Sequence, residues 1–264
     1  MPFHIHHISS LYLGLDRRIT VWLPPGWRAA RRRYPILLLN DGQNLFDPRR
    51  AFTGQTWRVR ETVAWLIRHK RMPPIIIAGI DHGGGRRGRE YLPIEDDRNP
   101  GAKDPLGGEY AEFVTREVLP FMLREYPIAA GASNTGFGGS SYGAIAALNT
   151  TMVKPGVFGR LLIESPSLYV GGEYLLRRAR AARRWPSRVY LGVGTTETSR
   201  ADRNEETVEN VRKLESILRR TGLGPRRLRV VVEEGGAHSE RAWARRLPGA
   251  LEFLYGSDPG LTPV

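Results

Sequence analysis

The sequence predicts an α/β fold, with a mostly parallel central sheet and helices on both of its faces. Short apolar runs alternate with helical patterns along the chain, which is typical of successive βαβ units. Two of these runs, residues 34–39 and 75–80, are apolar throughout, as strands buried on both faces are. With 264 residues and no cysteine, the chain is long enough to bury its core without disulfides. We expect one domain over residues 1–264.

Apolar and β-branched residues that end at turn residues predict the strands. The first of them carries His4, His6 and His7 near the N-terminus. Pro24, Pro25 and Gly26 end the second, because two prolines and a glycine stop strand pairing. The strands after the first are expected at 18–23, 34–39, 75–80, 135–140, 160–163, 189–193 and 228–232.

Apolar residues spaced three and four apart predict the helices. Pro120 falls inside one of them and is expected to kink it or end it early. Asp202 and Glu205 have the spacing of a capping box, so we expect Asp202 to be the N-cap of a helix that ends at Gly222. The other helices are expected at 57–68, 109–125, 142–152, 174–184 and 241–255.

The segments that remain are expected to be loops. Residues 82–106 are rich in glycine and charge, which predicts a long surface loop. Residues 165–187 hold one short arginine-rich helix pattern, too little chain for a separate cap domain. We therefore expect an open cleft.

The charge is strongly basic, with 40 lysines and arginines against 27 acids and a net charge of +13. The arginines are spread along the whole chain without interleaved aromatic residues, so a nucleic-acid surface is not expected. No apolar run approaches the roughly 20 residues of a membrane span. The N-terminus lacks the pattern of a signal peptide. We expect a cytoplasmic protein that binds neither nucleic acid nor membrane; the sequence does not indicate its oligomeric state.

Residues 138–143 read GGSSYG and contain the pattern G-x-S-x-G. In a strand-turn-helix setting this pattern places its serine on a tight turn with an exposed hydroxyl. Ser141 is the candidate nucleophile, since Gly139 and Gly143 flank it at two residues on each side. Ser140 is the weaker alternative because its residue at plus two is Tyr142. The helix after the turn would offer free N–H groups to an anion.

A serine hydroxyl needs a base to take its proton, and His238 is the candidate. It follows the last expected strand through Gly235 and Gly236, which would bring it to the same sheet edge as Ser141. His4, His6 and His7 are expected to be exposed strand residues rather than metal ligands. His69 fits a solvated helix end. His82 precedes the serine and fits substrate contact better.

The acid that orients the base should follow the strand before the last one. Glu197 occupies that position, after residues 189–193, and is the candidate. Asp202 is the alternative, although a helix N-cap explains it better. The order along the chain is then serine, acid, histidine, as in α/β-hydrolases.

These segments resemble one family. The chain is similar to the esterase D-type α/β-hydrolases, the "putative esterase" group, which includes S-formylglutathione hydrolases, enterochelin esterases, feruloyl esterases and mycolyltransferases. The resemblance spans most of the chain and implies the α/β-hydrolase fold and a small-molecule ester as substrate. It rests on VWLPPGW at 21–27, YPILLLNDGQNLFD at 34–47, REYLP at 89–93, GGSSYG at 138–143, GTTE at 194–197 and EGGAH at 234–238.

The resemblance also implies roles for individual residues. Ser141, His238 and Glu197 would form the catalytic triad, and the backbone N–H groups of Gln43 and Tyr142 would hold the oxyanion. We expect no cofactor and no metal. Two positions depart from it, since Tyr142 stands where methionine is frequent and Ala144 where a second glycine is common. The expected activity is ester hydrolysis through an acyl-enzyme; acyl transfer to an alcohol, or a non-catalytic basic binding protein, are the alternatives.

Overall fold

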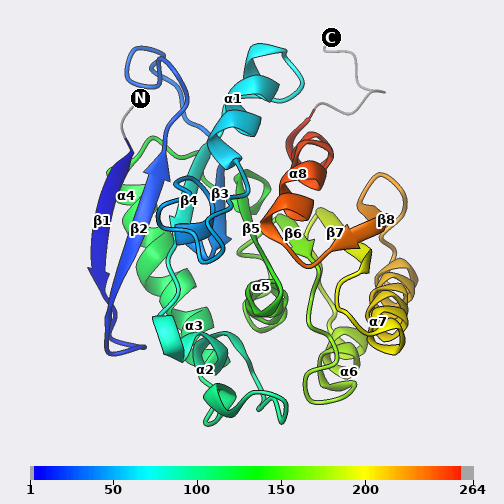
Figure 1. Ribbon diagram of the computed structural model, residues 1–264. Helices are drawn as coiled ribbons and strands as arrows, with labels where there is room; N and C mark the ends of the chain where they lie inside the picture. Colours follow the sequence, from blue (N-terminus) through cyan, green and yellow to red (C-terminus); the bar gives the residue numbers. More distant parts are fainter. Residues whose placement is uncertain (1–2, 257–264) are drawn as a thin grey trace.

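The computed structural model describes residues 3–256, and in this part of the chain eight strands form one mixed sheet (Figure 1). The strand order is β1-β2-β4-β3-β5-β6-β7-β8. β1 and β2 run antiparallel to their neighbours, and the other strands are parallel. The predicted α/β-hydrolase fold with a mostly parallel sheet is therefore confirmed. The strands are β1 (His4–Ser9), β2 (Asp16–Trp22), β3 (Ile36–Asn40), β4 (Ile76–Ile80), β5 (Thr135–Ser140), β6 (Arg160–Glu164), β7 (Arg188–Thr196) and β8 (Leu228–Ala237).

Helices cover both faces of the sheet, and the alternation of side chains along β3 shows how. Ile36 and Leu38 face one apolar cluster, while Leu37 and Leu39 face the other. α1 and α8 close the second cluster, and the remaining long helices pack on the opposite face (Figure 1). The helices are α1 (Val59–Arg68), α2 (Arg87–Tyr91), α3 (Gly107–Glu112), α4 (Leu119–Glu125), α5 (Tyr142–Val153), α6 (Tyr174–Ala181), α7 (Ala201–Arg220) and α8 (Glu240–Tyr255).

The helix expected at 109–125 is three segments in sequence. α3 is followed by a π-helical stretch, Phe113–Val118, which leads directly into α4. Pro120 lies at the start of α4 and has no N–H to donate to the carbonyl four residues earlier. The π-helical stretch directly before Pro120 accommodates this missing hydrogen bond. The helix therefore changes type near the proline and does not end there.

The prediction of a surface loop at 82–106 is partly wrong. This segment contains α2 and two short 3-10 turns, Gly84–Arg86 and Pro100–Ala102. Glu90, Tyr91 and Leu92 are fully buried. Arg17 of β2 donates two hydrogen bonds of 2.9 Å to the Glu90 carboxylate, so a buried ion pair anchors α2 to the sheet. Part of the charge in this segment is therefore buried in an ion pair and does not lie on the surface.

The carboxyl ends of the parallel strands meet at one edge of the sheet, and this edge positions the candidate site. β7 and β8 extend further than expected, to Thr196 and Ala237. Their ends approach closely at Gly194, where an added Cβ would lie 1.9 Å from the Gly236 carbonyl oxygen. Only glycine fits there. The residues that follow β7 and β8 are consequently brought side by side.

No helix between residues 3 and 256 is both long enough and apolar enough to cross a membrane.

Candidate active site

Ser141 occupies a sharp turn between β5 and α5. Its backbone has φ 57° and ψ −127°, a conformation that a residue with a side chain adopts only under strain. The flanking glycines permit the turn, because a Cβ on Gly139 would lie 2.7 Å from the Gly143 carbonyl carbon. Ser140, the alternative nucleophile, is only 4% exposed at the end of β5. Ser141 is the more accessible of the two hydroxyls.

Glu197 and His238 are in direct contact. His238 Nδ1 lies 2.6 Å from Glu197 Oε2, and the ionised carboxylate makes the imidazole the donor. The other carboxylate oxygen, Oε1, accepts hydrogen bonds of 2.6 Å from Ser165 Oγ and from the Gly194 N–H. Burial by itself would raise the pKa of Glu197, but the bonds from His238, Ser165 and Gly194 together hold it below its ordinary value. Glu197 is thus kept as a buried anion beside the imidazole.

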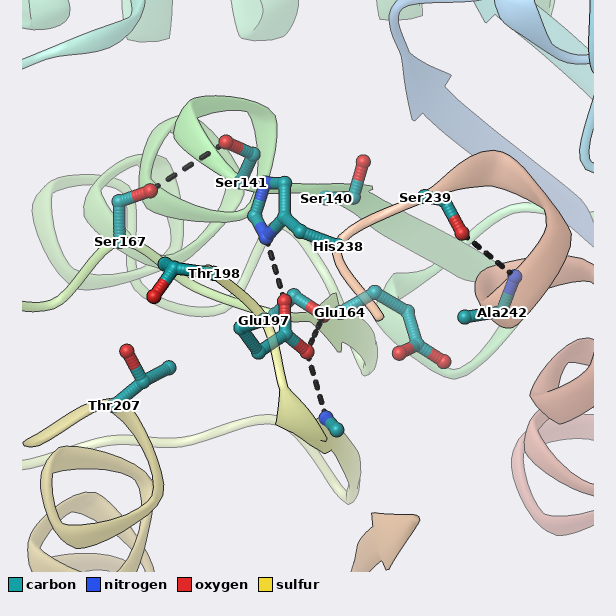
Figure 2. Close-up of polar contacts among 12 residues, drawn as sticks. Ser140, Ser141, Glu164, Ser167, Glu197, Thr198, Thr207, His238, Ser239 and Ala242 are labelled. Carbon is teal, nitrogen blue, oxygen red and sulfur yellow. Dashed lines mark hydrogen bonds and ion pairs between the residues drawn. The ribbon is translucent and has the colours of Figure 1, made fainter. Parts of the chain in front are cut away.

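His238 is oriented by its neighbours as well as by the carboxylate. Its ring makes an edge contact with the Trp243 indole, with the ring centroids 5.1 Å apart. The next residue, Ser239, caps α8 through a hydrogen bond from the Ala242 N–H to its Oγ. Figure 2 shows the second ring nitrogen of His238, the one not bonded to Glu197, turned toward Ser141. With Nδ1 protonated, this nitrogen has a free lone pair.

The Ser141 hydroxyl lies 3.4 Å from the hydroxyl of Ser167 (Figure 2). Ser167 follows β6 and is 5% exposed. It is the only partner of the Ser141 hydroxyl among the hydrogen bonds of residues 3–256. The Ser141 hydroxyl therefore rests against Ser167 in this structure, and none of the hydrogen bonds among residues 3–256 joins it to His238.

Two backbone N–H groups lie near the turn. Tyr142 is the first residue of α5, and Gln43 lies in a 3-10 turn, Gly42–Asn44, directly after β3. The first N–H groups of a helix have no partner within it, and they carry partial positive charge. The Gln43 side chain is engaged elsewhere at this edge, since its Oε1 accepts a 3.4 Å hydrogen bond from the N–H of His82, which follows β4. Both N–H groups are positioned by the ends of neighbouring strands.

Asp202 lies apart from this constellation. The residue at the N-cap of α7 is Arg200, which makes no side-chain cap, and Asp202 is in the first turn. Its exposed carboxylate forms a 2.6 Å ion pair with Arg200 instead. The predicted N-cap role is therefore wrong, because the helix begins at Ala201 and Asp202 lies inside its first turn.

The remaining histidines lie outside this constellation. His4, His6 and His7 lie on β1, as predicted, but only His7 is exposed; His4 and His6 are half-buried and both hydrogen-bond to the Tyr126 hydroxyl, at 3.1 and 2.6 Å. His69 is exposed at the end of α1 and stacks on Trp65. Burial lowers the pKa of His82, whose Nδ1 accepts a hydrogen bond from the Gly84 N–H. The described residues hold no group of three or more histidine and acidic side chains that could bind a metal.

The sequence interpretation missed a buried network behind Glu197. Ser165 Oγ, which donates to Glu197, accepts hydrogen bonds from Trp243 Nε1 at 2.9 Å and from Arg246 at 3.3 Å. Arg246 also forms ion pairs with Glu164 at 2.7 Å and Glu233 at 2.6 Å. Ser165 follows a buried strand at the same sheet edge as the candidate residues, and that position was the one available signal.

This network brings several charged side chains close together. Arg246 serves two carboxylates, and Glu197 lies close enough to act on Glu164 through its charge. Glu164 is 0% exposed, and burial raises its pKa to about 7 even though Arg246 partly opposes the rise.

Comparison with known proteins gives a family match over most of the chain. The profile of the family described as "Putative esterase" matches residues 10–254. "Uncharacterized protein YbbA" of Bacillus subtilis (strain 168) is 20% identical over 247 residues, which cover 92% of this chain and 94% of that protein.

Two solved structures share the fold. An IroE-like serine hydrolase from Shewanella oneidensis aligns with a TM-score of 0.77 and 17% identity, over 96% of this chain and 80% of that one. A ferulic acid esterase aligns with a TM-score of 0.73 and 18% identity, over 96% and 97% of the two chains.

Proposed function

Because the chain belongs to the esterase family described as "Putative esterase", we propose that it hydrolyses carboxylic esters with Ser141 as nucleophile, His238 as base and Glu197 as the acid that orients the base. The observation that carries the proposal is the 2.6 Å contact between His238 Nδ1 and the buried Glu197, at the sheet edge where the strained Ser141 turn lies. The names of the two structural relatives, a serine hydrolase and a ferulic acid esterase, are consistent with this chemistry.

The proposed reaction starts with proton transfer. The free ring nitrogen of His238 takes the proton of the Ser141 hydroxyl as Oγ attacks the ester carbonyl carbon. Glu197 holds the proton on Nδ1, so the nitrogen that faces Ser141 is unprotonated and can act as the base. The same carboxylate stabilises the imidazolium that forms. The hydroxyl leaves Ser167 for this step, which costs one weak hydrogen bond.

The developing oxyanion would be held by the N–H groups of Tyr142 and Gln43. Such donors stabilise the transition state more than the ground state because the negative charge appears only as the tetrahedral centre forms. His238 then gives its proton to the leaving alcohol, and an acyl group remains on Ser141. Water, activated by the same imidazole, attacks the acyl-enzyme and releases the acid.

Access to the site supports soluble esters as substrates. Between β6 and β7 the chain forms only α6 and its loops, and no separate cap domain is present among residues 3–256. We propose that the chain acts as a single domain with an uncovered cleft, and that small-molecule esters enter it directly.

Rapid mixing with p-nitrophenyl acetate tests the acyl-enzyme. We expect a covalent acetyl adduct on the peptide that contains Ser141 when the reaction is acid-quenched in the first turnovers. Added acceptor alcohols should change the products little, whereas a chain that transfers acyl groups to alcohols would form new esters. A quenched acetyl adduct on another residue, with none on Ser141, would rule out the proposed mechanism.

A further inference from the structure

One arginine outside the proposed triad contacts both sides of the proposed oxyanion site. Arg87 is the first residue of α2, in the segment expected to be a surface loop. Its guanidinium makes a two-pronged ion pair with Asp41, with Nε 2.7 Å from Oδ1 and Nη2 2.9 Å from Oδ2. The Asp41 side chain is only 6% exposed. Paired bonds of this kind fix direction as well as distance.

Asp41 controls the turn that presents the Gln43 N–H. It directly follows β3, and its backbone is left-handed, with φ 57° and ψ 47°. Its carbonyl accepts the Asn44 N–H at 2.8 Å, and its own N–H donates to the Tyr91 hydroxyl at 3.2 Å. A change in the direction of the Asp41 side chain would therefore be transmitted to the Gln43 N–H two residues later.

The same guanidinium contacts the turn that contains Ser141. The Arg87 Cζ lies 5.5 Å from the centroid of the Tyr142 ring, and Nη2 lies 3.5 Å from the Ser140 carbonyl oxygen. The two turns are closely packed beside this pair, since a Cβ on Gly143 would lie 2.8 Å from Asp41 Oδ2. Arg87 and Asp41 thus link the turn that carries Gln43 to the turn that carries Ser141 and Tyr142.

Charge gives a second reason for the pair. Without Arg87, the Asp41 carboxylate would be a buried and unpaired anion close to the site where the substrate oxygen becomes negative. Two like charges in a poorly solvated site repel strongly. The guanidinium cancels the carboxylate charge and leaves the N–H groups as the local positive field.

We propose that Arg87 is a positioning residue of the oxyanion site: it holds the Gln43 and Tyr142 N–H groups at a fixed separation through Asp41 and the Tyr142 ring. This inference rests on the proposed function. Arg87 acts through other residues and does not itself touch the substrate.

The test compares Arg87→Lys with Arg17→Lys. Lysine keeps the charge but cannot form the two-pronged pair. Arg17 is the matched control because it anchors the same helix through buried Glu90, and among the hydrogen bonds and ion pairs of residues 3–256 its side chain contacts neither Asp41 nor Tyr142. Removal of one oxyanion donor typically lowers kcat by about 10²- to 10³-fold. Since Arg87→Lys would only displace the donors, we expect kcat to fall about 10- to 100-fold and KM to change less than threefold.

A trifluoromethyl ketone supplies the readout that a purely structural role would leave unchanged. It forms a tetrahedral oxyanion on the serine, so its affinity should fall in Arg87→Lys by the same factor as kcat/KM. Arg17→Lys should lower the melting temperature but keep kcat and the ketone affinity within threefold. Equal kcat losses in both variants, or a ketone affinity that is unchanged in Arg87→Lys, would overturn the inference.

A double mutant keeps the test decisive if Arg87→Lys folds poorly. Asp41→Asn combined with Arg87→Gln removes both charges, and we expect its kcat loss to be no larger than that of Arg87→Gln alone, because the two side chains act as one unit and the double variant leaves no unpaired carboxylate. Additive losses would contradict action through Asp41. Fluorophosphonate labelling of Ser141 in wild type separates the two claims: no labelling refutes the proposed function, whereas normal labelling with an unaffected Arg87→Lys refutes only this inference.

Discussion

Replacing Glu197 by glutamine tests how the proposed acid works, because the change keeps the shape and removes only the charge. The glutamine has one carbonyl oxygen and one NH₂ group for two oxygen positions. At one position the donors are Ser165 Oγ and the Gly194 N–H, each at 2.6 Å, and at the other the partner is His238 Nδ1 at 2.6 Å. The NH₂ group cannot accept a hydrogen bond from either side.

The structure decides which orientation the amide takes. An NH₂ group facing Gly194 would meet a fixed backbone donor and leave it unpaired, at a cost of about 1–3 kcal/mol. The NH₂ group therefore faces His238, where the imidazole adapts by moving its proton to the other nitrogen. That nitrogen faces Ser141, so the base is held in the wrong tautomer. Such a change lowers kcat by about 10⁴-fold in a serine triad, equivalent to about 5.5 kcal/mol of the barrier.

The assay is kcat/KM for p-nitrophenyl acetate, with the melting temperature as a check on folding. Asp202→Asn is the matched control, since it removes an exposed carboxylate that forms an ion pair with Arg200. We expect Glu197→Gln to lose about four decades of activity and Asp202→Asn to stay within twofold. If Glu197→Gln kept a tenth of the wild-type activity, the tautomer argument would be wrong. A large loss in Asp202→Asn would make Asp202 the acid.

Three further predictions follow from the same geometry. Burial raises the pKa of Glu164 to about 7 from 4.5, so its contribution to stability is present below pH 4.5 and is lost as pH rises through 7. Between pH 4.5 and 8, urea unfolding should show that the free energy of unfolding of wild type falls by up to about 3 kcal/mol relative to that of Glu164→Gln. Parallel pH profiles of the two proteins would contradict the shift. Ser165→Ala removes one hydrogen bond to the Glu197 carboxylate and should lower kcat/KM about tenfold, far less than Glu197→Gln; an equal loss would show that Ser165 has another role. An uncovered cleft should give simple saturation kinetics with short-chain esters, whereas a sharp rise in rate above the solubility limit of the substrate would reveal an interfacial lid.

The candidate site could be located from the sequence because its parts each follow a strand. Parallel strands end at one edge of the sheet, so the order of Ser141, Glu197 and His238 along the chain already indicated a shared location. The contact between Glu197 and His238 agrees with that reasoning. Their catalytic roles stay predictions until they are measured.

The ion pairs around the candidate site could not be predicted, because they depend on packing between distant segments. Arg87 and Asp41 are 46 residues apart, and Arg246 and Glu164 are 82 apart. No local periodicity signals such pairs, because their geometry is set by how α2 and α8 pack on the sheet. Local rules also failed at Asp202, because α7 begins earlier than the capping-box spacing predicts and its N-cap is Arg200.

The identity of the nucleophile is the central claim, and covalent labelling tests it most directly. Wild type, Ser141→Ala and Ser140→Ala would each be treated with a fluorophosphonate and analysed by intact mass and peptide mapping, with heat-denatured protein as the blank. We expect one adduct per chain on Ser141 in wild type and in Ser140→Ala, and none in Ser141→Ala, whose turnover should fall by about 10⁴- to 10⁶-fold. An adduct in Ser141→Ala, or ester turnover that survives in it, would contradict the assignment.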